Sequence, residues 1–383
     1  MNETIYMPVG EVCSSISDTY REKKNMVTLI NTSDVLEGRV LNHERVPNSN
    51  LKGQFKKTFQ RDDILYSEIR PQNRRFAYVD FSPIDYIAST KLMVIRAKKD
   101  VVSPKYLYYF LKNSSTVAEL QLLAETRSGT FPQITFSEVA NLTIPVPPLA
   151  VQEVIVQTMQ CLEDKITCNE QINDNLQQQA MSLYAEMFLN SSDSNVTSGT
   201  LSDIAVITMG QSPSGSSYNE DGVGEVFYQG RAEFGFRFPK RRLFTTEPKR
   251  MAEAGDVLLS VRAPVGDLNI AYERCCIGRG LGAIHSKTGH SSFVLYTMFA
   301  LRSQLDVFNG EGTVFGSINR DALNAIPIDI PPVTEIDQFE VVAHPIDELI
   351  RANYEENCRL EAIRGSLLPK LMSGEIDVSA VQL

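Results

Sequence analysis

The strongest constraint on the fold is an internal duplication. The stretch NLTIPVPPLA at 141–150 and the stretch NAIPIDIPPVT at 324–334 both run from an apolar, strand-like segment into a Pro-Pro pair. The two pairs begin at Pro147 and Pro331, which lie 184 positions apart. Solenoid repeats have periods of about 20–50 residues, so a repeat of this length indicates a duplicated domain. We therefore expect two related domains, each followed by the same kind of segment.

Both copies carry the same features in the same order. VGEVCSSI in the first copy matches LSDIAVIT in the second, RDDILYSEIRP matches AGDVLLSVRAP, and the helix-like PKYLYYFLKN matches SSFVLYTMFALRSQ. Each copy then has a Gly-Thr pair, Gly129-Thr130 and Gly312-Thr313, before its Pro-Pro segment. Short alternating apolar runs bounded by Gly, Asn, Pro and Asp predict strands. Each copy is therefore expected to be a compact α+β domain. Five tyrosines of the first copy are expected in the core: Tyr66, Tyr78, Tyr106, Tyr108 and Tyr109.

The segments after the Pro-Pro pairs predict two long helices, because their apolar positions alternate in steps of four and three, as in a coiled-coil seam. The first seam is Ile155, Met159, Leu162, Ile166, Asn169, Asn173, Leu176, Ala180, Leu183 and Met187. The second, 184 positions later, is Phe339, Ala343, Ile346, Ile350, Asn353, Asn357, Leu360, Arg364, Leu367 and Leu371. At about 1.5 Å per residue each helix would span roughly 48 Å. Two domains joined by such rods suit a target with two separated features, such as B-DNA half-sites about 34 Å apart.

Two asparagines stand on each apolar seam, Asn169 and Asn173 on the first, Asn353 and Asn357 on the second. Asparagine in an apolar seam costs stability unless it finds a partner, and it sets register and pairing. The first pair lies at the midpoint of its seam, so in an antiparallel pair around a pseudo-twofold axis all four would meet at the centre. The alternative is two amphipathic helices packed separately on their own domains, with the asparagines facing solvent.

Prolines, charge and cysteines add further expectations. Pro345 and Pro369 predict a kink near residue 344 and a helix end near 368. The net charge of −10 at first argues against nucleic acid, but segments 146–200 and 333–383 each carry −6, so the two copies are near neutral with local basic clusters. The six cysteines lack metal-finger spacing, and neither a membrane span nor a signal peptide is evident. These patterns predict a cytoplasmic protein with reduced thiols.

With these features the chain resembles the DNA-specificity subunit of type I restriction-modification systems. The resemblance rests on IPVPPLAVQEVI and IPIDIPPVTEID, on the Gly-Thr approach to each, and on the tail LLPKLMSGEIDV. It covers essentially the whole chain, and its strength lies in the ordered, duplicated set. The SLYAEMF tail of the first copy departs from the SGEI pattern, and Glu335-Ile336-Asp337 lacks the glutamine found at Gln152.

The resemblance implies an α+β fold with two duplicated target recognition domains, separated by two long helices that form an antiparallel coiled coil with pseudo-twofold symmetry. Each domain would read one half of a bipartite double-stranded DNA target. The helices would set the spacer and dock two modification (methyltransferase) subunits, which carry S-adenosylmethionine, and motor-nuclease restriction subunits would join. The implied organisation is target recognition domain 1 at 1–148, spacer helix 1 at 149–190, a linker at 191–200, target recognition domain 2 at 201–332, and spacer helix 2 with the C-terminal tail at 333–383.

The residues also favour a chain without catalysis or bound cofactor. The Pro-Pro pairs lack the aromatic residue that ends an amino-methyltransferase loop, and no P-loop motif appears. The run Gly278-Arg279-Gly280-Leu281-Gly282 is weak as a cofactor motif, and we interpret it as a close-packed turn. Asp63 and Asp256 faintly fit a nuclease pattern, but their repetition favours turn residues before a strand. The four histidines are scattered and predict no metal site.

Candidate DNA contacts are basic clusters in equivalent regions of both copies, because lysine and arginine bind phosphates. They are Lys56, Lys57, Arg61, Arg70, Arg74, Arg75, Lys240, Arg241, Arg242 and Arg262; Lys249 and Arg250 form a further cluster. Gln229 and Arg231 occupy a polar loop where the first copy has Asn31 and Ser33, and they are candidates for reading bases. The alternatives remain ordinary solvated charge at these positions and, for the whole chain, a coiled-coil scaffold with two protein-binding domains.

Overall fold

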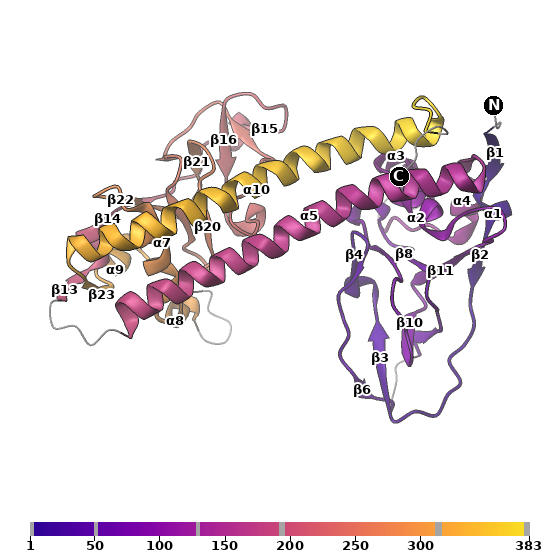
Figure 1. Cartoon of the computed structure of the whole chain (residues 1–383), viewed down its shortest axis with the longest axis horizontal. Helices are drawn as coiled ribbons and strands as arrows, with labels where there is room; N and C mark the ends of the chain where they lie inside the picture. The colour runs from indigo at the N-terminus through magenta and orange to yellow at the C-terminus, as the bar shows by residue number, and fades with distance from the viewer. Residues whose placement is uncertain (1–3, 50–52, 128–130, 191–195, 311–315, 379–383) are drawn as a thin grey trace. The chain divides into compact units, whose positions relative to one another are not determined.

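The computed structural model describes residues 4–49, 53–127, 131–190, 196–310 and 316–378 (Figure 1). The predicted Gly129-Thr130 and Gly312-Thr313 features lie outside these residues. The chain divides into two compact units. Unit 1 comprises residues 1–168 and 356–383, and unit 2 comprises residues 169–355. Within the described residues, no helix combines the length and apolar character needed to cross a membrane.

Unit 1 is built on two four-stranded sheets. The first has the order β2-β11-β8-β9 and is antiparallel, with β2 at Cys13–Ile16, β11 at Leu92–Ala97, β8 at Ile64–Ser67 and β9 at Phe76–Tyr78. The second has the order β6-β3-β10-β7, with β6 at Val46–Pro47, β3 at Met26–Ile30, β10 at Tyr86–Ser89 and β7 at Phe55–Lys57. Along β8, Ile64 and Tyr66 face one core cluster, and Leu65 faces the other. This period of two is that of a strand buried on both faces, so the strand predicted from DILYSEI is confirmed.

Helices cover the outer face of the first sheet. They are α1 (Val9–Val12), α2 (Pro104–Lys112), α3 (Ser114–Arg127) and α4 (Phe136–Asn141), and β1 (Ile5–Pro8) pairs antiparallel with β12 (Thr143–Val146). Within unit 1 the second sheet lies farther from these helices than the first (Figure 1). The predicted helix PKYLYYFLKN is α2. Of the five tyrosines expected in the core, Tyr66, Tyr106, Tyr108 and Tyr109 are buried and Tyr78 is half-buried.

Unit 2 repeats this architecture, with one additional edge strand in its second sheet. Its antiparallel sheet has the order β14-β22-β19-β20, with β14 at Ala205–Met209, β22 at Leu281–Ser286, β19 at Val257–Ser260 and β20 at Leu268–Ile270. The second sheet has the order β15-β17-β16-β21-β18, with β15 at Tyr218–Asn219, β17 at Phe244–Thr245, β16 at Glu225–Tyr228, β21 at Cys275–Ile277 and β18 at Met251–Ala252. In both units this second sheet contains one parallel pair, β3 with β10 and β16 with β21. The duplication seen in the sequence is therefore a duplication of fold.

The remaining elements of unit 2 match those of unit 1. The helices are α6 (Leu201–Ile204), α7 (Ser291–Ala300), α8 (Arg302–Asp306) and α9 (Arg320–Asn324). β13 (Thr197–Thr200) pairs antiparallel with β23 (Pro327–Ile330), as β1 does with β12. Because 197–200 form a strand, the expectation of a linker through residue 200 is wrong for these four positions. Their backbone hydrogen bonds to β23 outweigh the loop preference of a Ser/Thr/Gly composition.

Both aspartates interpreted as turn residues occupy the same position. Asp63 accepts from the amide of Gln60 at 2.8 Å, and Asp256 accepts from the amide of Glu253 at 2.8 Å. In each case the side chain closes the turn that leads into a central strand, as short aspartate side chains commonly do. The interpretation as structural turn residues is confirmed.

Two long helices follow the domains. α5 spans Leu149–Tyr184 and continues as a π-helical turn at Ala185–Leu189, and α10 spans Val333–Ser373 without a break. The predicted end of the second helix near 368 is therefore wrong. The helix is continuous through residue 344, and the kink expected there stays a prediction. Pro345 and Pro369 are exposed, while Ala343, Leu368 and Leu371 beside them are buried. Packing on either side can hold a helix through a proline that costs about 3 kcal/mol.

The long helices run antiparallel within each unit. In unit 1, Glu163 of α5 lies 3.8 Å from Arg364 of α10, and Asn357 donates to the carbonyl of Ile166. In unit 2, the ring of Tyr184 packs on that of Phe339, and Asn353 donates to Oδ1 of Asn173 at 2.8 Å. As residue numbers rise along α5 they fall along α10, so the predicted antiparallel pairing is confirmed in each unit.

The seam asparagines are not solvent-facing helix residues. Asn169 is fully buried and Asn173 is nearly so, and Asn173 also donates to the carbonyl of Ile350 at 3.3 Å. These bonds give the polar side chains partners inside an apolar seam, which is the condition under which asparagine is tolerated there. The meeting of all four asparagines stays a prediction.

Candidate nucleic-acid interface

Each copy places a short 3₁₀ turn after the parallel strand of its second sheet. The turn η1 (Thr32–Asp34) follows β3, and η5 (Arg231–Glu233) follows β16. The side-chain oxygen of Asn31 caps η1 by accepting from the amide of Thr32, so this oxygen is already hydrogen-bonded to the backbone. Gln229 is exposed just before η5. The polar loop predicted from sequence thus exists in both copies, with different side chains on it.

A second loop follows the central strand of each first sheet. The hydroxyl of Ser67 accepts from the amide of Ile69 at 3.0 Å, and the hydroxyl of Ser260 donates to the carbonyl of Arg262 at 3.0 Å. Ile69 and Arg262 each form an isolated antiparallel bridge, to Gln133 and Ser317. These matching contacts show that the loops after β8 and β19 are equivalent.

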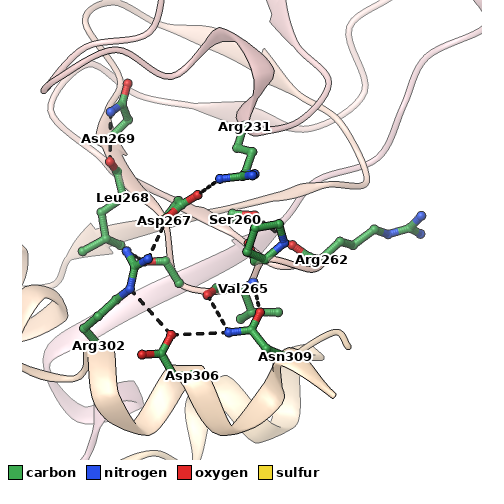
Figure 2. Close-up of polar contacts among 12 residues, drawn as sticks. Arg231, Ser260, Arg262, Val265, Asp267, Leu268, Asn269, Arg302, Asp306 and Asn309 are labelled. Carbon is green, nitrogen blue, oxygen red and sulfur yellow. Dashed lines mark hydrogen bonds and ion pairs between the residues drawn. The ribbon is translucent and has the colours of Figure 1, made fainter. Parts of the chain in front are cut away.

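An arginine ties the two loops together in each copy. In the first, Nη1 of Arg75 donates to the carbonyl of Ser33 in η1 at 3.0 Å. In the second, Arg231 of η5 pairs with Asp267 in the loop after β19 (Figure 2). Nη2 of Arg302 donates to the same carboxylate at 2.8 Å. The cross-link therefore recurs, although the arginine comes from opposite loops in the two copies.

Arg262 stands apart from this network. Figure 2 shows its side chain pointing away from the Arg231–Asp267–Arg302 cluster, and it is exposed. Its backbone is held by the Ser260 hydroxyl and by the bridge to Ser317. An arginine with a fixed backbone and an exposed guanidinium suits contact with phosphate or with a base edge.

The glycine-rich run is packed against the loop that carries Gln229. A Cβ added at Gly278 would lie 2.9 Å from the Cα and carbonyl oxygen of Gln229, and one at Gly280 would lie 2.8 Å from the same oxygen. The amides of both glycines bond to this region, Gly278 to Tyr228 at 2.8 Å and Gly280 to Gln229 at 3.2 Å. The interpretation as a close-packed turn is confirmed, and the glycines fix the backbone beneath Gln229.

Several of the basic candidates are engaged by the protein itself. Nζ of Lys57 donates to the carbonyls of Thr90 and Leu92, and burial lowers the pKa of this ammonium. Arg241 pairs with Glu273. Three more candidates have acidic or hydroxyl partners: Arg74 with Glu37 and Ser114, Arg231 with Asp267, and Arg242 with Glu220 and Glu233. Arg231, Arg241 and Arg242 are exposed although they are paired, and the exposed candidates outside the pairs named here are Lys56, Arg61, Arg70, Lys240 and Arg262.

The loop after β8 also contains strained backbone. Arg70 and Arg74 have φ values of 43° and 52°, in the left-handed region that glycine favours. They flank the short turn η2 (Pro71–Asn73), and the amide of Arg74 bonds to the carbonyl of Pro71 at 2.9 Å. Such strain costs about 1–3 kcal/mol and concentrates at binding loops. The arginine directions in this loop are therefore set by its backbone.

Sequence reasoning missed a buried arginine in the second copy. Arg237 lies in FGFRFPK, past η5, and contacts Tyr296 and Asp347. The phenylalanines on both sides were the available signal, since a charged residue between apolar neighbours in a loop is a candidate for burial. Among the described residues, no group of three histidine, cysteine, aspartate or glutamate side chains could hold a metal ion.

Two copies of one α+β frame, each with paired polar loops and each continued by a long helix, define a tandem two-domain protein. The family model for the type I restriction modification DNA specificity domain matches residues 6–178 and again residues 193–357. The chain therefore belongs to this family of type I restriction-modification specificity subunits.

Curated relatives and solved structures similar to this chain also come from type I restriction-modification systems. The chain is 31% identical over 336 residues to a putative type I restriction enzyme MjaX specificity subunit of Methanocaldococcus jannaschii, covering 82% of this chain and 79% of that one. It is 41% identical over 177 residues to the type I restriction enzyme HindI specificity subunit of Haemophilus influenzae, covering 46% and 39%. A structure from work on assembly and conformational transition of the type I R-M system aligns over 97% of this chain and 98% of that one, at 25% identity and a TM-score of 0.50. The type I S subunit of M. genitalium shares the fold at 16% identity, with a TM-score of 0.54 and coverage of 98% and 97%.

Proposed function

We propose that this specificity subunit reads a bipartite DNA target, with each copy reading one half. The supporting observation is that one frame presents different side chains at equivalent loop positions, Asn31 and Ser33 in the first copy, Gln229 and Arg231 in the second. Base recognition requires amide or forked side chains on a rigid frame. Two such frames with different side chains are suited to two different short sequences.

Phosphate contacts come from the exposed basic side chains. We assign them to Lys56, Arg61, Arg70, Lys240 and Arg262, which are exposed, are not among the paired side chains named above and lie outside the long helices. Each lysine or arginine that neutralises a phosphate steepens the salt dependence of binding. Binding should therefore weaken markedly as salt rises, whereas a purely protein-binding scaffold predicts no salt-dependent affinity for DNA.

The long helices set the spacing between half-sites and dock two modification subunits. Segments 146–200 and 333–383, which contain α5 and α10, each carry −6, so these helices repel DNA and favour basic protein surfaces. The methyltransferase chemistry and its S-adenosylmethionine belong to those partners, and restriction subunits complete the nuclease. The chain itself acts as a non-catalytic reader. A pull-down in which charge-reversed helix faces still recruit the modification subunit would contradict the electrostatic part of this proposal.

The deciding experiment is methylome sequencing of cells with and without the gene. We expect adenine methylation at one split motif to disappear when the gene is removed. An unchanged methylome, in cells that express the whole system, would contradict the proposal.

A further inference from the structure

A buried arginine joins the loop after η5 to the long helix α10. Arg237 is 3% exposed, and its Nη2 lies 3.4 Å from Oδ1 of Asp347 on α10. The same nitrogen donates to the hydroxyl of Tyr296 on α7 at 3.2 Å, and that hydroxyl donates to Asp347 at 2.8 Å. Three elements of unit 2 therefore meet at one charged group.

The next residue strengthens this attachment. Phe238 is 4% exposed, and its ring centroid lies 4.9 Å from that of Tyr354 on α10 and 5.7 Å from that of Tyr272. Aromatic pairs at such distances contribute about 0.5–1.5 kcal/mol beyond the area they bury. Two consecutive loop residues thus pack on the same long helix, one through charge and one through aromatic contact.

Stability alone does not account for the buried ion pair between Arg237 and Asp347. In Arg237, Nε and Nη1 have no hydrogen-bond partner within the described part of the chain. Burial raises the pKa of Asp347, and the attraction of Arg237 opposes that rise. A buried ion pair is often no better for stability than an apolar pair of similar volume. What a planar guanidinium adds is a fixed direction.

The segment that carries Arg237 is held rigidly to the η5 loop, which contains the candidate base-reading residue Arg231. Gly235, between η5 and Arg237, exchanges two hydrogen bonds with the side chain of Asn269 at 3.2 and 2.9 Å. The carbonyl of Arg237 accepts from the amide of Ile270 at 2.8 Å. Arg231, at the start of the segment, is held by Asp267. A shift at Arg237 would therefore reach Arg231 through a segment held at both ends.

We propose that Arg237 is a positioning residue for the second half-site, setting the orientation of the η5 loop against α10. This inference rests on the proposed function above. In the first copy, the carboxylate at the same repeat position, Glu163, pairs with Lys112 of α2 and accepts from Tyr109 at 2.9 Å. The tyrosine–carboxylate contact is present in both copies. In the first copy the carboxylate pairs with a cation from the helix α2, and in the second it pairs with a cation from the loop that follows η5.

The test is methylome sequencing of cells that carry the complete system with Arg237→Met/Asp347→Asn, a pair that removes both charges and leaves neither uncompensated. We expect methylation at sites mismatched in the second half to rise about five- to tenfold, since single mismatches cost about 1–3 kcal/mol. The first half should stay strict. The matched control is Lys112→Met/Glu163→Gln, which should leave both halves strict.

Phe238→Leu keeps both charges and loosens the same loop, so it provides an independent variant that should relax the second half to a smaller extent. Unchanged motifs in both Arg237 and Phe238 variants would overturn the inference. Equal relaxation of both halves, or a uniform fall in methylation with an unaltered motif, would also overturn it, because either result indicates a general loss of stability. A wild-type system without a split motif would instead overturn the proposed function, and this inference with it.

Discussion

The two copies attach to the long helices through the same contact and complete it differently. Tyr109 donates to Glu163 in the first copy, and Tyr296 donates to Asp347 in the second, at 2.9 and 2.8 Å. The two carboxylates lie 184 positions apart, at the repeat distance. The cation paired with each differs in origin, Lys112 from a neighbouring helix and Arg237 from a loop. We call the tyrosine, the carboxylate and its paired cation the clamp of each copy. Duplication has kept the position of the carboxylate, while the cation that pairs with it has diverged.

A similar exchange occurs at the starts of α2 and α7. In the first copy, Gln152 accepts from the amide of Ser103 at 2.8 Å at the start of α2. In the second, the equivalent position is Ile336, and Glu340, one turn further along α10, accepts from the amides of Ser292 and Phe293. The missing glutamine of the second copy is thus replaced by a carboxylate. A contact between domain and helix can move by one turn without losing its function.

The largest expected difference between the copies concerns the clamp cation. Arg237→Met leaves Asp347 buried without its cation and should destabilise the second domain by about 3 kcal/mol. Lys112→Met should cost the first domain about 1 kcal/mol, because Glu163 keeps Arg364 at 3.8 Å.

Buried thiols can measure each domain separately. Burial raises the pKa of Cys13 and of Cys275 to about 12, so alkylation of either requires its domain to open. Arg237→Met should accelerate alkylation of Cys275 and leave Cys13 slow. If the alkylation rates of both cysteines rose equally, Arg237 would not stabilise the second domain specifically.

The next effect in size is at the helix start. Gln152 is buried and also donates to the carbonyls of Val101 and Pro147. Gln152→Leu leaves these groups and the Ser103 amide unpaired and should cost about 2 kcal/mol in denaturant unfolding. The matched change Glu340→Gln keeps an acceptor and should cost less than about 1 kcal/mol. Comparable losses from both would contradict the proposed equivalence.

A smaller effect is expected in the seam. Asn173→Leu removes the acceptor of Asn353 and should cost about 1–2 kcal/mol. Because seam asparagines specify register, it should also alter the spacer length in the methylated motif. A stabilised protein with unchanged spacing would remove the register-setting role.

The smallest difference concerns the aspartates at the start of β8 and β19. Arg96 binds Asp63 through two nitrogens at 2.7 and 2.8 Å, whereas Asp256 pairs with His285, whose side chain is 58% exposed. Asp63→Asn should cost about 1.5 kcal/mol in denaturant unfolding and Asp256→Asn about 0.5 kcal/mol. The reverse order would show that the histidine pair is the stronger one.

Most of the fold could be predicted from the sequence, because the patterns that specify it lie within short stretches and recur in both copies. The strand periodicity around Ile64 and Val257, the helix seams and the turn aspartates all lie within short windows and recur at matching places. The end predicted near residue 368 was wrong, because buried neighbours of Pro369 hold α10 together, and a local rule does not include them.

The interface was harder to predict, because the state of a basic residue depends on distant partners. Arg241 and Glu273, or Lys57 and Thr90, come together only through the fold. Lysines and arginines with such partners look the same in sequence as exposed ones. Arg237 was missed for the same reason, since Asp347 is far from it in the chain.

The central claim is that each copy reads its own half of a split target. Replacing residues 1–148 with the corresponding domain of another family member, in cells that express the complete system, tests it most directly when the methylome is sequenced. We predict that one half of the methylated motif changes and that the other half and the spacer stay as they were. A motif that changes in both halves, or in neither while methylation persists, would contradict the account.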